Sequence, residues 1–223
     1  MTDSTTTFLT DTRAAYDAIA PAFAEAFPDI LTDLPLERAL LSAFAEQVTA
    51  HGPEPVADVG SGPGHVTARL HSLGVPVFGI DISPRMAALA REAHPDLRFH
   101  VGSMTALDVP DATLGGLLAL YSVIHVPDEH LPTVFAEFRR VLVPGGQLLL
   151  SFQMADPAAD GTEHLHLSER FGQEIALDYY WRTPQAVAAE LTKAGLTLQA
   201  RVVREPLGRE KRPRAFLLAR KPE

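Results

Sequence analysis

The chain of 223 residues contains no cysteine. This absence excludes disulfide bonds, a thiolate nucleophile, and any zinc or iron–sulfur site with cysteine ligands. Basic residues are also scarce, with 19 Lys and Arg against 28 Asp and Glu and a formal net charge of −9. Nucleic-acid binders usually present a basic face, so no nucleic-acid partner is expected.

Long apolar runs are missing as well. No run approaches the roughly 20 residues that a membrane-spanning helix needs. The chain begins Met-Thr-Asp-Ser, without the basic and apolar regions of a secretory signal. Together with the lack of cysteine, these features predict a soluble cytoplasmic protein without a membrane partner.

Two helical patterns occupy the first 52 residues. Apolar residues recur every three or four positions within residues 12–27 and again within residues 35–51. Both stripes are expected to pack against a larger body. We therefore predict an N-terminal helical cap over residues 1–52 and a second domain over residues 53–223.

From position 56 onward, short apolar runs alternate with segments of helical length. Strands are predicted at 56–59, 77–80, 97–101, 114–120 and 147–152, and helices at 64–73, 83–94 and 131–142. Strands that alternate with helices and are apolar on both faces indicate a parallel sheet covered on both sides. The predicted fold class is α/β, a doubly wound, Rossmann-like three-layer sandwich.

Residues 153–182 interrupt this alternation. They contain prolines, glycines and acids without a clear period, and we expect an irregular, lid-like insertion. Beyond it, the pattern predicts a helix at 183–194 and strands at 196–203 and 215–219. The last two strands are joined by only about a dozen residues without helical pattern, which favours an antiparallel pair.

Three glycines follow the first predicted strand, at positions 60, 62 and 64. Glycine allows a tight turn and a close approach of the backbone to a ligand, and the next helix would offer N–H groups to a carboxylate or phosphate. A dinucleotide fingerprint requires glycine or alanine at position 65, where this chain has His65. A Walker lysine is also missing, so a nucleoside triphosphate is disfavoured.

An acid ends the second predicted strand, in Gly79-Ile80-Asp81-Ile82-Ser83. A carboxylate about 20 residues past the glycines can accept both hydroxyls of a ribose. With Asp58-Val59-Gly60-Ser61-Gly62-Pro63-Gly64 before it and Leu142-Val143-Pro144-Gly145-Gly146 after it, the sequence resembles the class I S-adenosylmethionine-dependent methyltransferases. The resemblance implies a seven-stranded sheet whose last strand is antiparallel, S-adenosylmethionine as the cofactor, and methyl transfer to an oxygen, nitrogen or carbon atom of a small molecule.

The resemblance also implies roles for individual residues. Those expected at the methionine part of the cofactor are Tyr16, Asp58, Gly60, Ser61 and Gly62. Those expected at its ribose, its adenine and the transferred methyl are Asp81, Ile82, Met86, Ser103, Met104 and Tyr121. Ser103 stands where the family usually has an acid, so this adenine contact would carry no charge. Packing in the core is the alternative role for Met86 and Tyr16.

Three further features carry candidate chemistry. His125 follows the fourth strand and is the candidate catalytic base, with packing as the alternative. His164 and His166 lack a metal-binding signature, so no metal is predicted there, and they are expected to face solvent or substrate. The arginine-rich segment 209–214 is expected to form a solvated hairpin tip.

Three functions stay open at this stage. A small-molecule methyltransferase, as a monomer or homodimer, is favoured over a non-catalytic sensor or interaction module that binds the same cofactor. A nicotinamide-dependent oxidoreductase is less favoured because of His65. The run Tyr179-Tyr180-Trp181 slightly favours an aromatic acceptor.

Overall fold

A computed structural model of the chain describes residues 4–28, 31–155 and 162–223. A seven-stranded sheet forms its centre, with strand order β3-β2-β1-β4-β5-β9-β8. The strands are β1 (Val56–Val59), β2 (Val77–Asp81), β3 (Arg98–Val101), β4 (Leu114–Leu120), β5 (Leu142–Gln153), β8 (Thr197–Arg204) and β9 (Arg214–Arg220). The first five strands are parallel, whereas β9 runs antiparallel to both β5 and β8. This arrangement confirms the predicted fold class.

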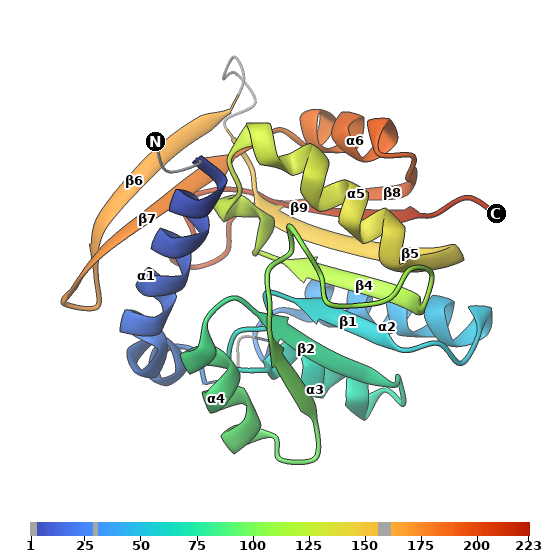
Figure 1. The fold of residues 1–223 in the computed structure, drawn as a ribbon, viewed down its shortest axis with the longest axis horizontal. Coiled ribbons are helices and arrows are strands. Elements are labelled where there is room, and N and C mark those ends of the chain that lie inside the picture. The colour runs from blue at the N-terminus through green and yellow to red at the C-terminus, as the bar shows by residue number, and fades with distance from the viewer. Residues whose placement is uncertain (1–3, 29–30, 156–161) are drawn as a thin grey trace.

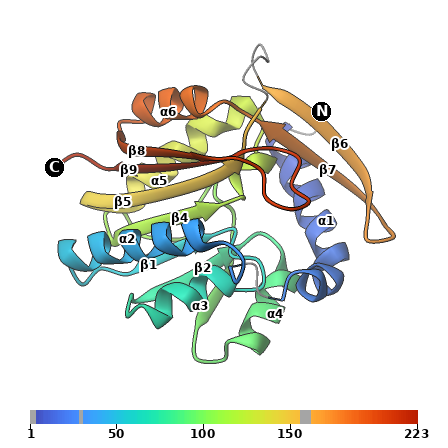
Figure 2. The same cartoon turned by 180° about the vertical axis from the view of Figure 1, so that it is seen from behind.

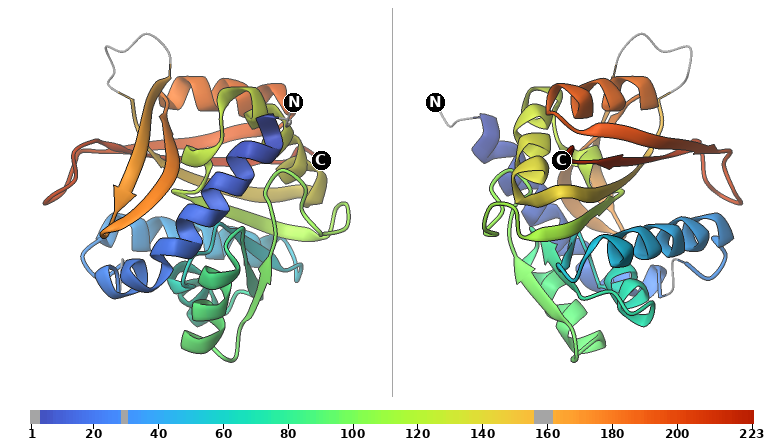
Figure 3. Two further views of the ribbon diagram at one scale, coloured as in Figure 1. Left: turned by 60° about the vertical axis from the view of Figure 1, so that its left-hand side comes forward. Right: turned by 90° about the vertical axis from the view of Figure 1, so that its right-hand side faces the viewer.

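Helices cover both faces of the sheet (Figures 1 and 2). One face carries α5 (Leu131–Val141) and α6 (Pro184–Lys193), and the other carries α2 (Pro35–His51), α3 (His65–Ser72) and α4 (Pro84–Ala93) (Figure 3). The apolar stripe of α5 is fully buried through Val134, Phe135 and Phe138, and that of α2 through Leu41 and Phe44. The sheet is therefore apolar on both sides, as its continuous hydrophobic strands require.

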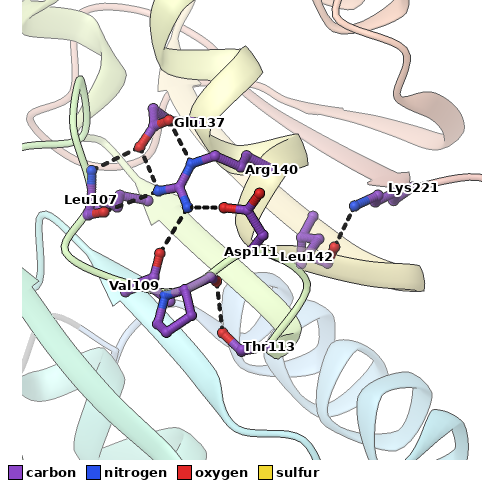
Figure 4. A network of polar contacts seen from close by, with 9 residues as sticks. Leu107, Val109, Asp111, Thr113, Glu137, Arg140, Leu142 and Lys221 are labelled. Atoms are coloured by element: carbon purple, nitrogen blue, oxygen red, sulfur yellow. Dashed lines mark hydrogen bonds and ion pairs between the residues drawn. The ribbon is translucent and has the colours of Figure 1, made fainter.

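The connection between β3 and β4 is held by one arginine of α5 (Figure 4). Arg140 donates to the carbonyl oxygens of Leu107 and Val109, over 3.0 and 2.8 Å, and pairs with Glu137 and Asp111. Glu137 also accepts a hydrogen bond from the backbone nitrogen of Leu107. These contacts satisfy backbone groups of a loop that has no strand or helix of its own.

The first helix, α1 (Ser4–Ala26), begins eight residues before the predicted start at Thr12. Threonine and serine have low helix propensity, so the run from Ser4 to Thr10 gave no helical signal. Tertiary packing overrides this preference, because the ring of Phe8 stacks on that of His130, with 4.8 Å between ring centroids.

The prediction of an irregular insertion at residues 153–182 was wrong for its larger part. Residues 163–181 form an antiparallel hairpin of β6 (Glu163–Arg170) and β7 (Gln173–Trp181), while residues 156–161 lie outside the described ranges. Phe171 and Gly172 form the turn with φ of 53° and 74°. Hairpin turns of this kind usually begin with Asn or Asp rather than Phe, and the strands are largely polar, so the pattern was missed.

This hairpin and α1 lie side by side beyond the carboxyl ends of β1 and β4 (Figure 3, left). In an open parallel sheet, ligands bind beyond those strand ends, at the point where the strand order reverses. Here the reversal lies between β1 and β4. The fold therefore directs attention to the turn after β1.

Candidate active site

The glycine turn after β1 has a left-handed backbone at all three glycines, with φ of 81° at Gly60, 52° at Gly62 and 92° at Gly64. A Cβ atom at Gly60 would lie 2.3 Å from Cβ of Ser122, and one at Gly64 would lie 2.8 Å from Cζ of Phe99. At Gly62, by contrast, nothing lies within 4 Å. Gly60 and Gly64 are thus required by packing, whereas Gly62 presents bare backbone to open space.

Asp81, at the end of β2, is joined to this turn. Its Oδ2 accepts a hydrogen bond from the backbone nitrogen of Gly62, and its Oδ1 accepts one from that of Ser83, both over 2.8 Å. Burial raises the pKa of Asp81 to about 6, although the two N–H donors favour the ionised form. Each carboxylate oxygen keeps a second lone pair for a ligand.

Asp58 lies deeper, within β1, and is only 2% exposed. Its Oδ2 accepts a hydrogen bond from the hydroxyl of Thr67 in α3, over 2.6 Å, and burial raises its pKa to about 6. The sequence offered no signal for Thr67, which is nine residues away. In the described structure Asp58 therefore supports the turn from below, and its predicted contact with a cofactor amino group stays a prediction.

Helix α1 is attached to the same region by Asp17. Its Oδ1 accepts hydrogen bonds from the hydroxyl of Ser83, over 2.6 Å, and from the backbone nitrogen of Arg85, over 3.1 Å. Both donors belong to the first turn of α4, where a helix leaves its N–H groups unpaired. Sequence reasoning named the neighbouring Tyr16 but missed Asp17, because the contact spans 66 residues.

Tyr16 and His125 meet at the centre of the site. The hydroxyl of Tyr16 lies 2.7 Å from Nε2 of His125, and Nδ1 of His125 lies 2.8 Å from the carbonyl oxygen of Asp178. A carbonyl only accepts, so Nδ1 carries the proton and Nε2 accepts from Tyr16. Burial lowers the pKa of His125 to about 4, and burial also raises that of Tyr16. Both groups are therefore uncharged at neutral pH.

The residues expected around adenine lie in two environments. Ile82 is half-buried beside Asp81, and so are Ser103 and Met104 after β3. Ser103 contacts the hydroxyl of Thr105 over 2.8 Å. Met86 is only 1% exposed and lies within α4, so its side chain packs in the interior of the described structure. Its contact with adenine stays a prediction.

Tyr121 comes directly after β4 and has an unusual positive φ of 54°. Burial raises its pKa to about 12. The guanidinium of Arg214 lies 5.8 Å from the centre of its ring. The charges that act on its hydroxyl are those of Glu37, Arg204, Glu210 and Arg214, so its predicted contact with the cofactor stays a prediction.

The expectation of a solvated tip at residues 209–214 was wrong for part of the segment. The side chain of Arg214 is only 11% exposed and pairs with Glu210, and Arg212 covers the ring of Trp181 at 3.7 Å while pairing with Glu163. A cluster of basic residues in a sequence predicts solvent exposure. The groups that Arg212 contacts, Trp181 and Glu163, belong to the hairpin of β6 and β7, so the local sequence does not reveal them.

His164 and His166 lie on the outward face of the hairpin and both contact Oδ1 of Asp178, over 2.9 and 2.8 Å. The three side chains are well exposed. Within the described part of the chain, no group of three or more acidic, histidine or cysteine residues could hold a metal ion.

Comparison with known proteins adds to this geometry. Residues 56–146, which contain the turn and Asp81, match the family described as methyltransferase domain. Over 139 residues the chain is 31% identical to demethylmenaquinone methyltransferase of Chlorobaculum parvum, covering 60% of this chain and 56% of that protein. It is 27% identical over 134 residues to malonyl-acyl-carrier-protein O-methyltransferase of Serratia marcescens, covering 60% and 52%.

The match to a methyltransferase domain over residues 56–146 agrees with the resemblance to the class I S-adenosylmethionine-dependent methyltransferases. The chain's alignments span 56% and 52% of the two curated relatives named above. The fold is shared with 1,6-didemethyltoxoflavin-N1-methyltransferase of Burkholderia thailandensis, at a TM-score of 0.70 and 21% identity over 100% of this chain and 92% of that one. It is also shared with the 4+2 cyclase SpnF, at a TM-score of 0.75 and 17% identity over 96% and 97%.

The glycine turn fits S-adenosylmethionine in two respects. Because Gly62 has no side chain and nothing lies within 4 Å of the place where a Cβ would stand, a ligand can approach the backbone of the turn closely. The hydroxyl of Ser61 is buried and has no hydrogen-bond partner among the described residues. A buried polar group without a partner is costly, and a ligand with a donor or acceptor would remove that cost.

No helix in the described residues is long and apolar enough to cross a membrane.

Proposed function

We propose that this protein transfers the methyl group of S-adenosylmethionine to a small-molecule acceptor in the cytoplasm. The observation that carries the proposal is the joined pair of Gly62, open to a ligand, and Asp81, hydrogen-bonded to it at the end of the neighbouring strand. The names demethylmenaquinone methyltransferase and 1,6-didemethyltoxoflavin-N1-methyltransferase, which belong to two of the similar proteins, support a small-molecule acceptor.

The cofactor would be held by two groups of residues. Tyr16, Asp58, Gly60, Ser61, Gly62 and Tyr121 would surround its methionine part and its sulfonium. Asp81, Ile82, Met86, Ser103 and Met104 would bind its ribose and adenine. When bound, the cofactor supplies an activated methyl carbon, and the protein has to align an acceptor with it. Alignment of bound reactants contributes about 7–11 kcal/mol.

His125 takes a proton only through Tyr16 in this arrangement. Its Nδ1 is held by the carbonyl of Asp178 and its Nε2 by the hydroxyl of Tyr16. A proton from the acceptor would pass to the oxygen of Tyr16 as the hydroxyl proton of Tyr16 passes to Nε2. We therefore propose that Tyr16 contacts the acceptor and that His125 acts behind it.

A non-catalytic role has one specific observation in its favour. A protein with the same fold is named as a cyclase, so the fold by itself does not require methyl transfer. A protein that binds the cofactor without transferring its methyl group would also keep Gly62 and Asp81. A nicotinamide-dependent oxidoreductase is disfavoured by His65, at the position where close helix packing requires a small residue.

The test combines binding and transfer. Calorimetric titration with S-adenosylmethionine, S-adenosylhomocysteine and NADH should show binding of the first two only. Incubation with methyl-labelled cofactor and fractionated bacterial metabolites should then label a product. Cofactor binding without label in any fraction would favour a non-catalytic sensor over an enzyme. Absence of cofactor binding would contradict both functions.

A further inference from the structure

Arg170 is the last residue of β6, and its guanidinium makes few polar contacts with the described residues. Its Nη1 donates to the hydroxyl of Tyr179 over 2.5 Å, and the rings of Phe23 and Phe171 lie 5.8 and 5.2 Å from its central carbon. Within the described ranges, no carboxylate lies at ion-pair distance from it. A guanidinium has five N–H donors, so most of its capacity for an anion is free.

Four other arginines of the C-terminal half contact a carboxylate. Arg182 pairs with Asp128, Arg204 with Glu37, Arg212 with Glu163 and Arg214 with Glu210. The chain as a whole has nine more acids than bases. An arginine that has no carboxylate partner among the described residues, and that lies half-buried between two aromatic rings, is suited to binding an anionic ligand.

Arg170 also lies next to the reacting groups. Tyr179, which it contacts, packs against His125 with 4.7 Å between ring centroids, and Tyr16 adjoins both rings. The charge of Arg170 acts on the pKa values of Tyr16, His125 and Tyr179. Arg170 therefore lies near the pair of Tyr16 and His125, which the proposed function assigns to the acceptor.

The solvent-exposed surface next to Arg170 is apolar and aromatic. Phe171 is 40% exposed and Phe27 is 37% exposed, and the ring of Phe27 packs against that of Phe23. Exposed aromatic rings beside a cation suit contact with a flat molecule that carries an acidic group.

We propose that Arg170 determines acceptor specificity by binding an anionic group, a carboxylate or an acidic oxygen, of an aromatic methyl acceptor. This inference rests on the proposed function and names the class of acceptor. The same chemistry would suit the carboxylate of the cofactor itself, so the experiment has to separate the two sources.

The test uses Arg170→Gln, with Arg170→Lys as the conservative variant and Arg209→Gln as a matched control. Arg209 is exposed and loses the same charge on substitution. A bacterial metabolite extract is divided by ion exchange into acidic, neutral and basic fractions before reaction with methyl-labelled cofactor. We expect label in the acidic fraction, a loss of about 10- to 100-fold in kcat/KM with Arg170→Gln through a higher KM, and partial recovery with Arg170→Lys. Arg209→Gln should behave as the wild type.

Binding provides a second readout that does not depend on turnover. In the presence of S-adenosylhomocysteine, 4-hydroxybenzoate should bind the wild type at least about tenfold tighter than 4-hydroxybenzamide, and Arg170→Gln should remove this difference. Affinity for S-adenosylmethionine should be equal in all four proteins.

Several outcomes would overturn the inference while leaving methyl transfer intact. These are label in the neutral or basic fraction, an unchanged KM in Arg170→Gln, or equal binding of the two benzoate analogues by the wild type, including no binding of either. A tenfold loss of S-adenosylmethionine affinity in Arg170→Gln would assign Arg170 to the cofactor instead. Failure of the wild type to bind S-adenosylmethionine would defeat the proposed function itself.

Discussion

At the scale of single residues, the site combines carboxyl groups and an imidazole whose titration is displaced by burial. Asp58 and Asp81 titrate near 6 rather than near 3.8, and His125 titrates near 4 rather than near 6.5. In each case the uncharged form is favoured because the charged form loses hydration. A raised pKa of an acid and a lowered pKa of a base change the stability of the fold in opposite directions as the pH falls, so measurements at several pH values distinguish the two contributions.

We expect cofactor affinity to fall on the acid side of pH 6. A protonated Asp81 offers a weaker acceptor to ribose hydroxyls, so S-adenosylmethionine should bind with falling affinity as the pH drops from about 7 to about 5. Asp81→Asn should weaken binding at pH 7.5 by about 1.5–3 kcal/mol and should flatten this dependence. Calorimetry at several pH values measures both. A wild-type affinity that is constant over this range would contradict the role of Asp81.

His125 should make the fold less stable in acid. In the unfolded chain histidine takes up a proton below about pH 6.5, whereas the folded His125 stays neutral down to about 4. The unfolded state therefore binds protons first, and the free energy of unfolding falls as the pH drops through this window, by up to about 1.4 kcal/mol per pH unit. Asp58 and Asp81 act in the opposite sense between about 3.8 and 6.

The contribution of His125 is isolated by His125→Phe, which removes the titrating group. Urea unfolding between pH 4.5 and 7 should show a smaller loss of stability in acid for the variant than for the wild type. Parallel curves for the two proteins would show that His125 does not titrate in the displaced range.

At the scale of elements, helix α1 acts as a cover whose position depends on α4. Asp17 joins the two helices through Ser83 and Arg85, next to Asp81. Helix α1 also contacts β7, which carries Tyr179, and reaches His125 through Tyr16 and His130 through Phe8. A cover fastened by few polar contacts can open locally at low cost and admit ligands.

Asp17→Ala should loosen α1 while leaving the sheet intact. We expect faster amide hydrogen exchange in residues 12–26 and an S-adenosylmethionine dissociation rate about tenfold higher, because a cap of this kind contributes about 1 kcal/mol or somewhat more. Asp11→Ala is the matched control, since Asp11 is an exposed acid on the same helix. Equal exchange in the two variants would show that Asp17 does not hold α1.

At the scale of the whole molecule, a buried ion pair links the two ends of the chain. Glu37 in α2 and Arg204 in β8 are 4% and 8% exposed, lie 167 residues apart, and meet over 2.7 Å. Arg204 also binds Glu210, and these charges adjoin Tyr121. The pair therefore fastens the helix that leads into β1 to the far edge of the sheet, behind a ring of the proposed site.

Glu37→Gln should be among the more damaging changes away from the glycine turn. It leaves Arg204 with one carboxylate instead of two in a buried setting, and breaking a buried pair costs about 3–5 kcal/mol. We expect a loss at the lower end of this range in urea unfolding, because Glu210 remains. Exposed Glu205 offers the control variant Glu205→Gln, which should change stability by less than about 0.5 kcal/mol. Equal midpoints for both variants would contradict a structural role for the pair.

Local patterns in the sequence were enough to predict the central sheet. Apolar runs of strand length, helices between them, the glycines at 60, 62 and 64 and the acid at 81 each depend on neighbouring residues only. The three-layer fold, the antiparallel last strand and the resemblance to the methyltransferases followed from them. The start of α1 and the hairpin of β6 and β7 were missed, because their local propensities are weak and packing decides their structure.

Tertiary structure alone decided which distant side chains meet. Nothing local indicates that Asp17 contacts Ser83, that Tyr16 contacts His125, or that Glu37 contacts Arg204, at separations of 66, 109 and 167 residues. These contacts arise when helices and a hairpin bury their apolar faces against the sheet, and hydrogen-bond partners are then chosen among the polar groups that burial brings together. Local patterns therefore determined the central sheet and the glycine turn. The charge state of His125 and the surroundings of the Arg170 guanidinium, by contrast, depend on the packing of elements that lie far apart in the chain.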